Sequence, residues 1–284
     1  MELVRELSDD GRERIREETP LADIGFDSIA CAEFAALVQE RFGLDVADGE
    51  VTPQTTVGQL SRVVDGAAAA GLRDSGVPVG LGRFQGVAKR VVSGLIEWWF
   101  DLRVDHPERM PSEGPVVMCM NHDSALDIPV AVAASRRPVT FMAKKELFRS
   151  GGTARFVHEL GGFSVERGAF DLRAVEIALA VLKRGQVLGM YPEGTRTPGV
   201  LLPFLPGAAW AALKTGAALL PVAIRGTDTA MPPHRRVPRR VPIRVSFDEP
   251  ILVQRVEDVA VRRKEADRLT SELRARVEGM LSAV

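Results

Sequence analysis

Residues 115–127 read PVVMCMNHDSALD, and their pattern indicates the fold class of the larger part of the chain. Residues 116–120 form a short, wholly apolar run of the kind that predicts a strand buried on both faces. A helical pattern over 125–135 follows directly, and Pro129 falls in its first turn, where proline is tolerated. A buried strand that passes through a polar turn into a helix predicts an α/β layer with a largely parallel sheet.

The same alternation continues through the rest of the chain. Apolar runs predict strands at 115–120, 139–143, 162–166, 187–191, 219–224 and 243–247. Amphipathic stretches predict helices at 84–100, 125–135, 153–160, 171–184, 207–215 and 255–281. We therefore expect an α/β domain over residues 84–284, with helices that flank the sheet.

The first 66 residues have a different character. They carry 15 Asp and Glu against 6 Arg, a net charge of −9, whereas the remainder of the chain carries +8. Their apolar residues follow helical spacing, and residues 67–83 are rich in Gly, Ala and Pro. We expect a two-domain α+β protein: a small all-α helical bundle over 1–66, a linker over 67–83 and the α/β domain over 84–284. The charge difference either favours docking of the two domains or only keeps the small one soluble.

Several classes of protein are excluded by composition. Cys31 and Cys119 are far apart and lack metal-ligand spacing, so we expect neither a zinc site nor a disulfide framework, and no metal. The N-terminus is acidic and has no apolar segment typical of a signal peptide. No apolar run approaches the ~18 residues that a membrane-spanning helix requires. A cytoplasmic protein is expected, with no nucleic-acid partner.

One serine stands where a covalent group could be attached. Asp27 and Ser28, within GFDSI at residues 25–29, lie where a helical pattern begins, and Asp27 is a typical N-cap. A phosphate ester on Ser28 would lie against the free N–H groups of the helix N-terminus, where the helix dipole favours an anion. An Asp-Ser pair by itself is more often only a helix cap.

The residues around Ser28 resemble the acyl carrier protein family over about residues 8–66. The resemblance rests on TPLADIGFDSI at 19–29, RFGL at 41–44 and TTVGQL at 55–60. It implies that Ser28 carries 4′-phosphopantetheine, attached by a phosphopantetheinyl transferase, and that this arm carries an acyl thioester. The chain departs from the family in a short segment before residue 19 and in a less acidic recognition helix, where Gln39 and Arg41 flank Glu40.

A histidine and an aspartate follow the strand quoted first. A lone histidine is usually structural, but His122 lies between a buried strand and a helix, and Asp127 falls within reach of its ring. A carboxylate that holds one imidazole nitrogen fixes the tautomer and leaves the other nitrogen free to take a proton. That arrangement suits a general base that activates a hydroxyl.

The order of motifs is similar to that of the glycerolipid acyltransferase family, which includes 1-acylglycerol-3-phosphate acyltransferases. The motifs are NHDSALD at 121–127, AKKEL at 143–147, GFSVER at 162–167, YPEGTRT at 191–197 and LLPV at 219–222. The resemblance covers about residues 84–250 and implies that His122 is the catalytic base and Asp127 its orienting partner. It also implies an acceptor-phosphate site made by Arg167, Glu193, Gly194, Thr195 and Arg196.

The residue types suit that site. Guanidinium groups present forked donors to phosphate, and a glycine turn lets backbone N–H groups approach it. Glu193 is acidic, so we expect it to orient an arginine or a hydroxyl. The chain departs from the family at FLPG, residues 204–207, where a basic residue usually stands between Phe and Gly, and at Gly151 and Gly152, where the family tends to have proline. The first departure favours an unusual acceptor.

Aromatic and basic residues raise the question of membrane contact. Trp98, Trp99 and Phe100 end the 84–100 helix, and residues 234–240 read HRRVPRR. Such residues suit a helix that lies in the surface of an anionic bilayer. Alternatively, the helix packs within its own domain and the arginines are solvated.

The combined expectation is an acyltransferase of phospholipid biosynthesis, built as a fusion protein. It would move an acyl group from a phosphopantetheine thioester, on its own or a separate carrier, to a hydroxyl of a lysophospholipid such as 1-acylglycerol-3-phosphate. One alternative is acylation of a sugar, alcohol or amine in natural-product biosynthesis. Another is a carrier or scaffold module with an inactive transferase half. The expected location is cytoplasmic, with peripheral contact at the inner face of the membrane.

Overall fold

The computed structural model describes residues 18–24, 26, 30–31, 34, 51–60, 62, 85–144, 162–165, 172–233, 235 and 237–283. Contacts within the chain define two compact units: residues 1–78 with 165–177, and residues 79–164 with 178–284. The predicted linker over 67–83 lies outside the described residues, so the domain boundaries at 66 and 84 stay predictions.

The described part of the first unit is a small apolar cluster around a 3-10 helix. This helix, η1, spans Leu21–Ile24, and the backbone N–H of Leu21 donates to the carbonyl of Thr55 at 2.9 Å. Phe26 and Phe34 are buried, with ring centroids 6.4 Å apart. The all-α bundle stays a prediction, because most of residues 1–66 lie outside the described ranges.

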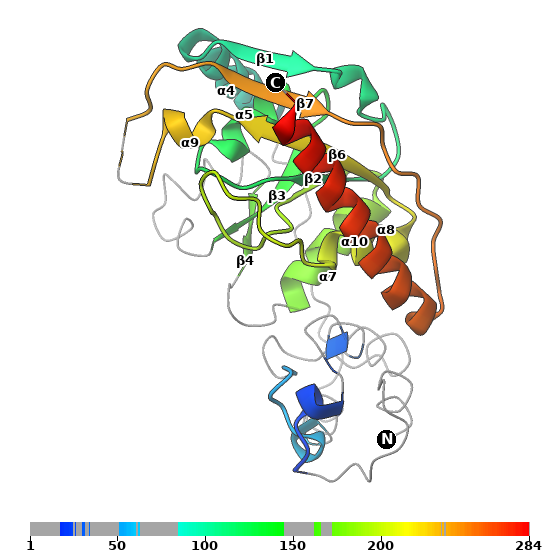
Figure 1. Cartoon of the computed structure of the whole chain (residues 1–284). Coiled ribbons are helices and arrows are strands. Elements are labelled where there is room, and N and C mark those ends of the chain that lie inside the picture. The colour runs from blue at the N-terminus through cyan, green and yellow to red at the C-terminus, as the bar shows by residue number, and fades with distance from the viewer. Residues whose placement is uncertain are drawn as a thin grey trace. The chain divides into compact units, whose positions relative to one another are not determined.

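The second unit contains a seven-stranded sheet (Figure 1). The strands are β1 (Leu102–Asp105), β2 (Val116–Met120), β3 (Val139–Lys144), β4 (Gly162–Val165), β5 (Val187–Met190), β6 (Ala218–Arg225) and β7 (Ile243–Phe247). Their order is β1-β7-β6-β2-β5-β3-β4. The pairs of β2 with β5 and β6, of β3 with β5 and of β1 with β7 are parallel, whereas β6 and β7 are antiparallel. The predicted largely parallel sheet is therefore confirmed, and the six predicted strands are present within one or two residues.

Helices cover both faces of this sheet. The described helices from residue 85 onward are α4 (Gln85–Trp99), α5 (Asp127–Ala134), α7 (Leu172–Lys183), α8 (Gly207–Thr215), α9 (Thr227–Ala230) and α10 (Val259–Ser282), with a 3-10 helix η2 at Pro107–Arg109. Residues from α4 and α5 share one core with Val116, Met118 and Met120 of β2. Successive strand residues face opposite sides, so α8 and α10, which also contact the central strands, cover the other face. In Figure 1, α10 crosses in front of β6. The predicted helix over 153–160 lies outside the described residues.

The central strand places the motif that follows it. Every residue of β2 is buried, as its uninterrupted apolar run predicted. In the parallel pairing, Cys119 of β2 lies beside Met190 at the end of β5. The carboxyl ends of these two strands therefore meet at one edge of the sheet, which brings residues 121–127 close to residues 191–197. This edge is where ligands bind in open α/β sheets.

Candidate active site at the carboxyl end of β2

His122 and Asp127 form a buried contact at this edge. His122 is 4% exposed and Asp127 is 0% exposed. The ring Nδ1 of His122 lies 2.8 Å from Oδ2 of Asp127. Asp127 is the first residue of α5, so the helix start aims the carboxylate at the preceding loop. The two residues have the proximity that their spacing in the sequence predicted.

The carboxylate of Asp127 accepts four hydrogen bonds. Its Oδ2 accepts from His122 Nδ1 and from the backbone N–H groups of Asp123 and Ser124, each at 2.8 Å. Its Oδ1 accepts from the hydroxyl of Thr227 at 2.5 Å. A buried carboxylate with this many donors is held in one orientation. His122 is thereby held with its proton on Nδ1, which leaves Nε2 as the acceptor.

The loop that carries His122 is tied to neighbouring segments. The side-chain amide of Asn121 donates to the carbonyl of Ile224 at 2.9 Å, and its oxygen accepts from the N–H of Ile224 at 2.8 Å. The hydroxyl of Ser124 donates to the carbonyl of Met231 at 2.9 Å. Because Ile224 belongs to β6, which pairs with β2, these bonds fix the loop to the sheet. The geometry at His122 is therefore set by the fold.

Glu193 fixes the other side of the loop. The backbone N–H of His122 donates to Glu193 Oε1 at 2.7 Å, and that of Leu202 donates to Oε2 at 2.9 Å. The N–H of Thr197 donates to the carbonyl of His122 at 2.9 Å. Burial raises the pKa of Glu193. The expectation from the sequence was that Glu193 orients an arginine or a hydroxyl. In the structure it accepts from two backbone N–H groups and joins the His122 loop to the segment after β5.

The next three predicted phosphate-binding residues lie on an exposed turn. Gly194 has a φ of +70°, a left-handed conformation that favours glycine, and its N–H donates to the carbonyl of Tyr191 at 3.0 Å. Gly194, Thr195 and Arg196 are all exposed. Arg196 has no hydrogen bond or ion pair to a residue within the described ranges. Arg167 and Ser28, the other two predicted site residues, lie outside those ranges.

An aromatic residue at the site was missed by the sequence reasoning. The rings of Tyr191 and His122 are stacked, with centroids 4.1 Å apart and an interplanar angle of 21°. The Tyr191 hydroxyl is buried and has no hydrogen-bond partner among the described residues. Burial, together with the charge of Asp127, raises the pKa of Tyr191 well above its ordinary value. The available signal was an aromatic residue just after β5, at the edge of the sheet that carries His122.

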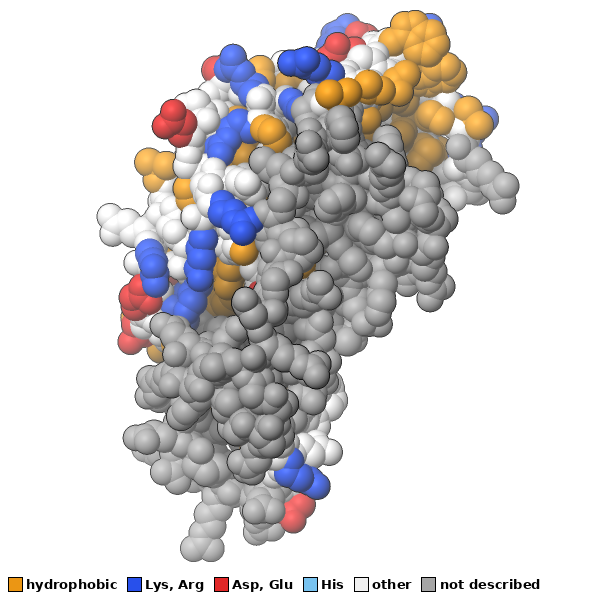
Figure 2. Space-filling view, turned by 180° about the vertical axis from the view of Figure 1, so that it is seen from behind, with side chains coloured by type: hydrophobic (Ala, Val, Ile, Leu, Met, Phe, Trp, Pro, Cys, Tyr) orange, Lys and Arg blue, Asp and Glu red, His pale blue; other side chains and the backbone are white. Residues whose placement is uncertain are grey.

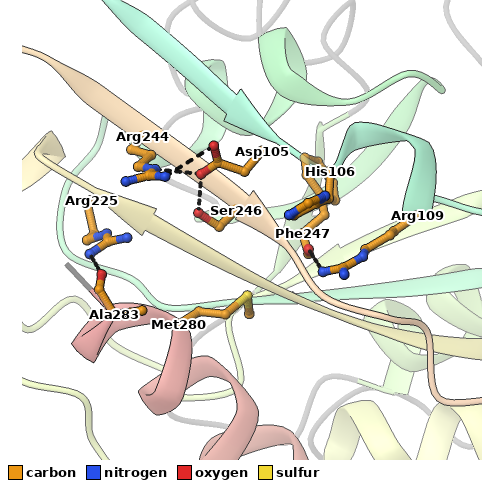
Figure 3. A pocket seen from close by; sticks show the side chains of 9 residues that line it. All are labelled: Asp105, His106, Arg109, Arg225, Arg244, Ser246, Phe247, Met280 and Ala283. Atoms are coloured by element: carbon orange, nitrogen blue, oxygen red, sulfur yellow. Dashed lines mark hydrogen bonds and ion pairs between the residues drawn. The ribbon is translucent and has the colours of Figure 1, made fainter.

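A separate pocket, distinct from this site, lies over β1, β6 and β7 near the end of α10 (Figure 3). Three arginines line it, and each is partnered within the protein: Arg244 with Asp105, Arg109 with Glu249 and Arg225 with the backbone carbonyl of Ala283. Two of these arginines are therefore paired with carboxylates, and the third is held by a backbone carbonyl. Within the described part of the chain, no group of His, Cys, Asp or Glu could hold a metal ion.

Known proteins match the two parts of the chain separately. Residues 101–225 match the family described as Acyltransferase, and residues 1–64 match the family described as Phosphopantetheine attachment site. A 1-acyl-sn-glycerol-3-phosphate acyltransferase of Bacillus subtilis (strain 168) is 29% identical over 129 residues, which cover 45% of this chain and 64% of that protein. The protein of the same name from Borreliella burgdorferi is 31% identical over 124 residues, 43% of this chain and 50% of that protein.

A solved structure matches the fold. It is the crystal structure of the 1-acyl-sn-glycerophosphate acyltransferase PlsC from Thermotoga maritima, which matches with a TM-score of 0.58 and 25% identity over 70% of this chain and 80% of that chain. The chain spans about half to two thirds of the length of the two relatives named above. The chain therefore joins a domain of the phosphopantetheine-attachment family, over residues 1–64, to a domain of the acyltransferase family, over residues 101–225.

Proposed function

We propose that the protein is an acyltransferase that moves an acyl group from a phosphopantetheine thioester to a hydroxyl of a lysophospholipid such as 1-acylglycerol-3-phosphate. The observation that carries the proposal is the buried contact of 2.8 Å between His122 and Asp127 at the carboxyl end of β2. The two families matched by the chain and the names of its relatives support the same reaction. The pathway would be phospholipid biosynthesis.

In this mechanism His122 is the general base. Asp127 holds Nδ1, so Nε2 takes the proton of the acceptor hydroxyl. The acceptor oxygen attacks the thioester carbonyl and forms the new C–O bond. The C–S bond then breaks, and the imidazolium returns its proton to the leaving thiolate. No acyl-enzyme intermediate is needed, because the thioester donor is already activated.

The acceptor's phosphate is assigned to the exposed turn after β5. Arg196 and Thr195 offer donors that are not used within the described structure, and Gly194 gives the turn its left-handed bend. Arg167 is proposed as a second guanidinium donor, and Glu193 supports the turn through backbone bonds to the loops on either side.

The donor is proposed to be a thioester on the chain's own carrier domain. Ser28 would carry 4′-phosphopantetheine after treatment with a phosphopantetheinyl transferase, since residues 1–64 match the attachment-site family. Intact-mass spectrometry of the treated chain tests this, with Ser28→Ala as the control that cannot be loaded. The acyl-loaded chain is then mixed with lysophosphatidate, and loss of the acyl group from the protein together with formation of phosphatidate supports the function. Two negative results together would instead support a carrier or scaffold module with an inactive transferase half. The loaded chain would retain its acyl group with every acceptor tried, and the chain would also transfer no acyl group from a separate acyl carrier.

Mixing two variants shows which carrier is used. Ser28→Ala supplies an intact transferase site, and acyl-loaded His122→Ala supplies only the carrier. Transfer in the mixture means that a separate carrier can serve as donor. Transfer by the wild-type chain, with no transfer in the mixture of the two variants, means that the carrier serves its own transferase site.

A second acceptor class is favoured by one observation. Leu205 is 59% exposed at the place where the glycerolipid family usually has a basic residue. The loss of that charge favours a neutral acceptor, such as a sugar or alcohol in natural-product biosynthesis, or an amine. Competition between lysophosphatidate and the matching monoacylglycerol, which lacks only the phosphate, distinguishes the two: preference for the phosphorylated acceptor supports the first function.

We also propose peripheral contact of α4 with the inner face of a membrane. One face of α4 is buried in the core through Val92 and Ile96, while the opposite face exposes Val87, Val91, Leu95 and Trp98, with exposed fractions of 56%, 56%, 57% and 70%. Hydrophobic side chains gather over this end of the molecule at the upper right of Figure 2. Among the described helices, none is long and apolar enough to cross a bilayer. Apolar residues spaced one turn apart, with basic residues nearby, suit a helix that lies in the interface.

Vesicle sedimentation tests this contact. Binding of the wild-type chain to vesicles that contain phosphatidylglycerol is expected to fall in Val91→Ser with Trp98→Ser, because both side chains are exposed. Leu252→Ser is the matched control, since Leu252 is 83% exposed but lies outside α4. Equal binding by the α4 variant and the control would contradict the proposal.

A further inference from the structure

Three aromatic rings are arranged in a column at the candidate active site. The Tyr191 ring is stacked on His122 at 4.1 Å and lies nearly parallel to the Phe141 ring, with centroids 6.2 Å apart and an interplanar angle of 20°. Phe141 belongs to β3 and is 1% exposed. The imidazole is therefore held at two places: Asp127 at its Nδ1 edge and the Tyr191 ring on its face.

A glycine makes room for this column. Gly189 of β5 lies opposite Phe141 of β3 in the parallel pair. A Cβ on Gly189 would lie 2.2 Å from Cε1 of Phe141, so the Phe141 ring occupies the space that a side chain would need. Tyr191 follows β5 directly, two residues after Gly189, and the Phe141 ring lies over Gly189 and is stacked with Tyr191. The sequence of β5 thus brings the Phe141 ring against Tyr191.

We infer that Tyr191 is a positioning residue, whose ring face holds the imidazole of His122 in the plane from which Nε2 takes the acceptor proton. The inference rests on the proposed acyl transfer. One hydrogen bond to Asp127 fixes a point on the ring but leaves its tilt free, and the stack removes that freedom. The negative face of an aromatic ring also attracts the imidazolium formed after proton transfer.

The ring, and not the hydroxyl, performs this role. The hydroxyl of Tyr191 is buried and makes no hydrogen bond to any part of the chain that the structure describes. Tyr191→Phe retains the stack and removes only an unsatisfied polar group, which is neutral or slightly stabilising. Tyr191→Leu retains apolar volume but removes the aromatic face.

NMR of the histidine ring protons tests the stack without any assay of activity. The chain has four histidines, and His122→Asn assigns the signal of interest. Protons of an imidazole above an aromatic face are shifted upfield, so we expect this shift in the wild type and Tyr191→Phe and its loss in Tyr191→Leu. An unchanged His122 signal in folded Tyr191→Leu would overturn the inference. If Tyr191→Leu does not fold, Gly189→Ala is the second variant, because the added methyl group displaces the Phe141 ring that packs on Tyr191. An unchanged His122 signal in Gly189→Ala would count against the column of rings in the same way.

Steady-state kinetics then test the consequence. Tyr191→Leu is expected to lower kcat about tenfold with little change in KM, and Tyr191→Phe is expected to restore most of kcat. Phe247→Leu, a buried ring of the same unit outside the column, is the control and retains kcat. Full kcat in Tyr191→Leu contradicts the positioning role. A wild-type chain that shows the NMR shift but transfers no acyl group contradicts the proposed function and leaves the stack intact.

Discussion

The candidate active site has two halves that differ in burial and in hydrogen bonding. In the first half, Asp127 is 0% exposed and accepts four hydrogen bonds, and His122 is 4% exposed. In the second half, Gly194, Thr195 and Arg196 lie on an exposed turn, and Arg196 has no partner within the described ranges. The two halves lie close together in space, because the ends of β2 and β5 are adjacent.

This contrast indicates which part of the proposed reaction is prepared before the substrates bind. A proton acceptor must be aligned before reaction, so its contacts are built into the fold. A binding turn for a charged group retains free donors until the ligand arrives, since donors already paired internally would have to be released first. Variants of the first half should therefore lower kcat, and variants of the second half should raise KM.

His122→Ala is expected to have the largest effect. Loss of a general base lowers kcat by about 10²–10⁴-fold, and we expect the upper end because no other base is held at this position by described contacts. Loading of Ser28 should be unchanged in the same protein, as measured by intact mass. A His122→Ala chain that transfers acyl groups at the wild-type rate would remove the base from the proposed mechanism.

Asp127→Asn should have the next largest effect on kcat. The amide oxygen can accept from the backbone N–H groups, but an amide has no charge with which to hold the imidazolium. The amide NH2 group would also point at hydrogen-bond donors that the carboxylate oxygens accept from. We expect kcat to fall about 10²-fold or more and the melting temperature to fall as well. Asp228→Asn, on neighbouring α9, is the matched control; similar losses in both variants would mean that the effect is not specific to the buried carboxylate.

The parts of the fold that the sequence predicted are those encoded locally. The uninterrupted apolar run of β2 predicted a central strand, and the spacing of His122 and Asp127 predicted their contact across one loop. By contrast, β1 reads LRVD and is a short outer strand of mixed exposure, so its pattern is weak. The antiparallel direction of β7 also has no local signal, because it depends on the path of the chain from β6.

Contacts across long stretches of sequence could not be predicted. Thr227 donates to Asp127 from 100 residues away, and the chemistry of a threonine in a helix start does not reveal its partner. The bonds from Glu193 to backbone groups were also missed, since an acidic residue in a phosphate-binding motif suggested a side-chain partner. The stack of Tyr191 on His122 depends on the adjacency of β2 and β5, which only the sheet order provides.

Glu193 joins the two halves. Its variants therefore test whether it supports the His122 loop or binds the acceptor directly. Glu193→Ala removes the acceptor of the His122 and Leu202 N–H groups and leaves both unsatisfied, which costs about 1–3 kcal/mol each where the groups stay dry. We expect kcat to fall about tenfold and thermal stability to fall, with Glu193→Gln intermediate in both. Loss of phosphate-acceptor affinity alone, with kcat intact, would instead assign Glu193 to the acceptor.

Arg196→Ala tests the exposed half alone. Because the side chain is exposed and unpaired in the described structure, we expect no loss of stability, unchanged kcat and a KM for lysophosphatidate that rises about tenfold. The same variant should leave the KM for an acceptor without phosphate unchanged. Arg103→Ala is the matched control, since the Arg103 side chain is 71% exposed and lies on β1. An equal rise of KM for both acceptors would argue against phosphate recognition by Arg196.

Asp123 bridges the halves and should give the smallest effect, visible in the pH dependence of stability. Its Oδ1 accepts from the N–H of Gly199 at 3.1 Å, and its pKa is raised by burial first, with Asp127 also raising it. A raised pKa means that the folded state binds the Asp123 proton more tightly than the unfolded state does. Protonation of Asp123 therefore stabilises the fold fully below the unfolded pKa, and this stabilisation is lost as pH rises through the folded pKa. The free energy of unfolding of the wild type minus that of Asp123→Asn should therefore decrease from about pH 4 to pH 7 in urea titrations. If this difference in free energy stays constant or increases over the range, the charged form of Asp123 does not destabilise the folded state.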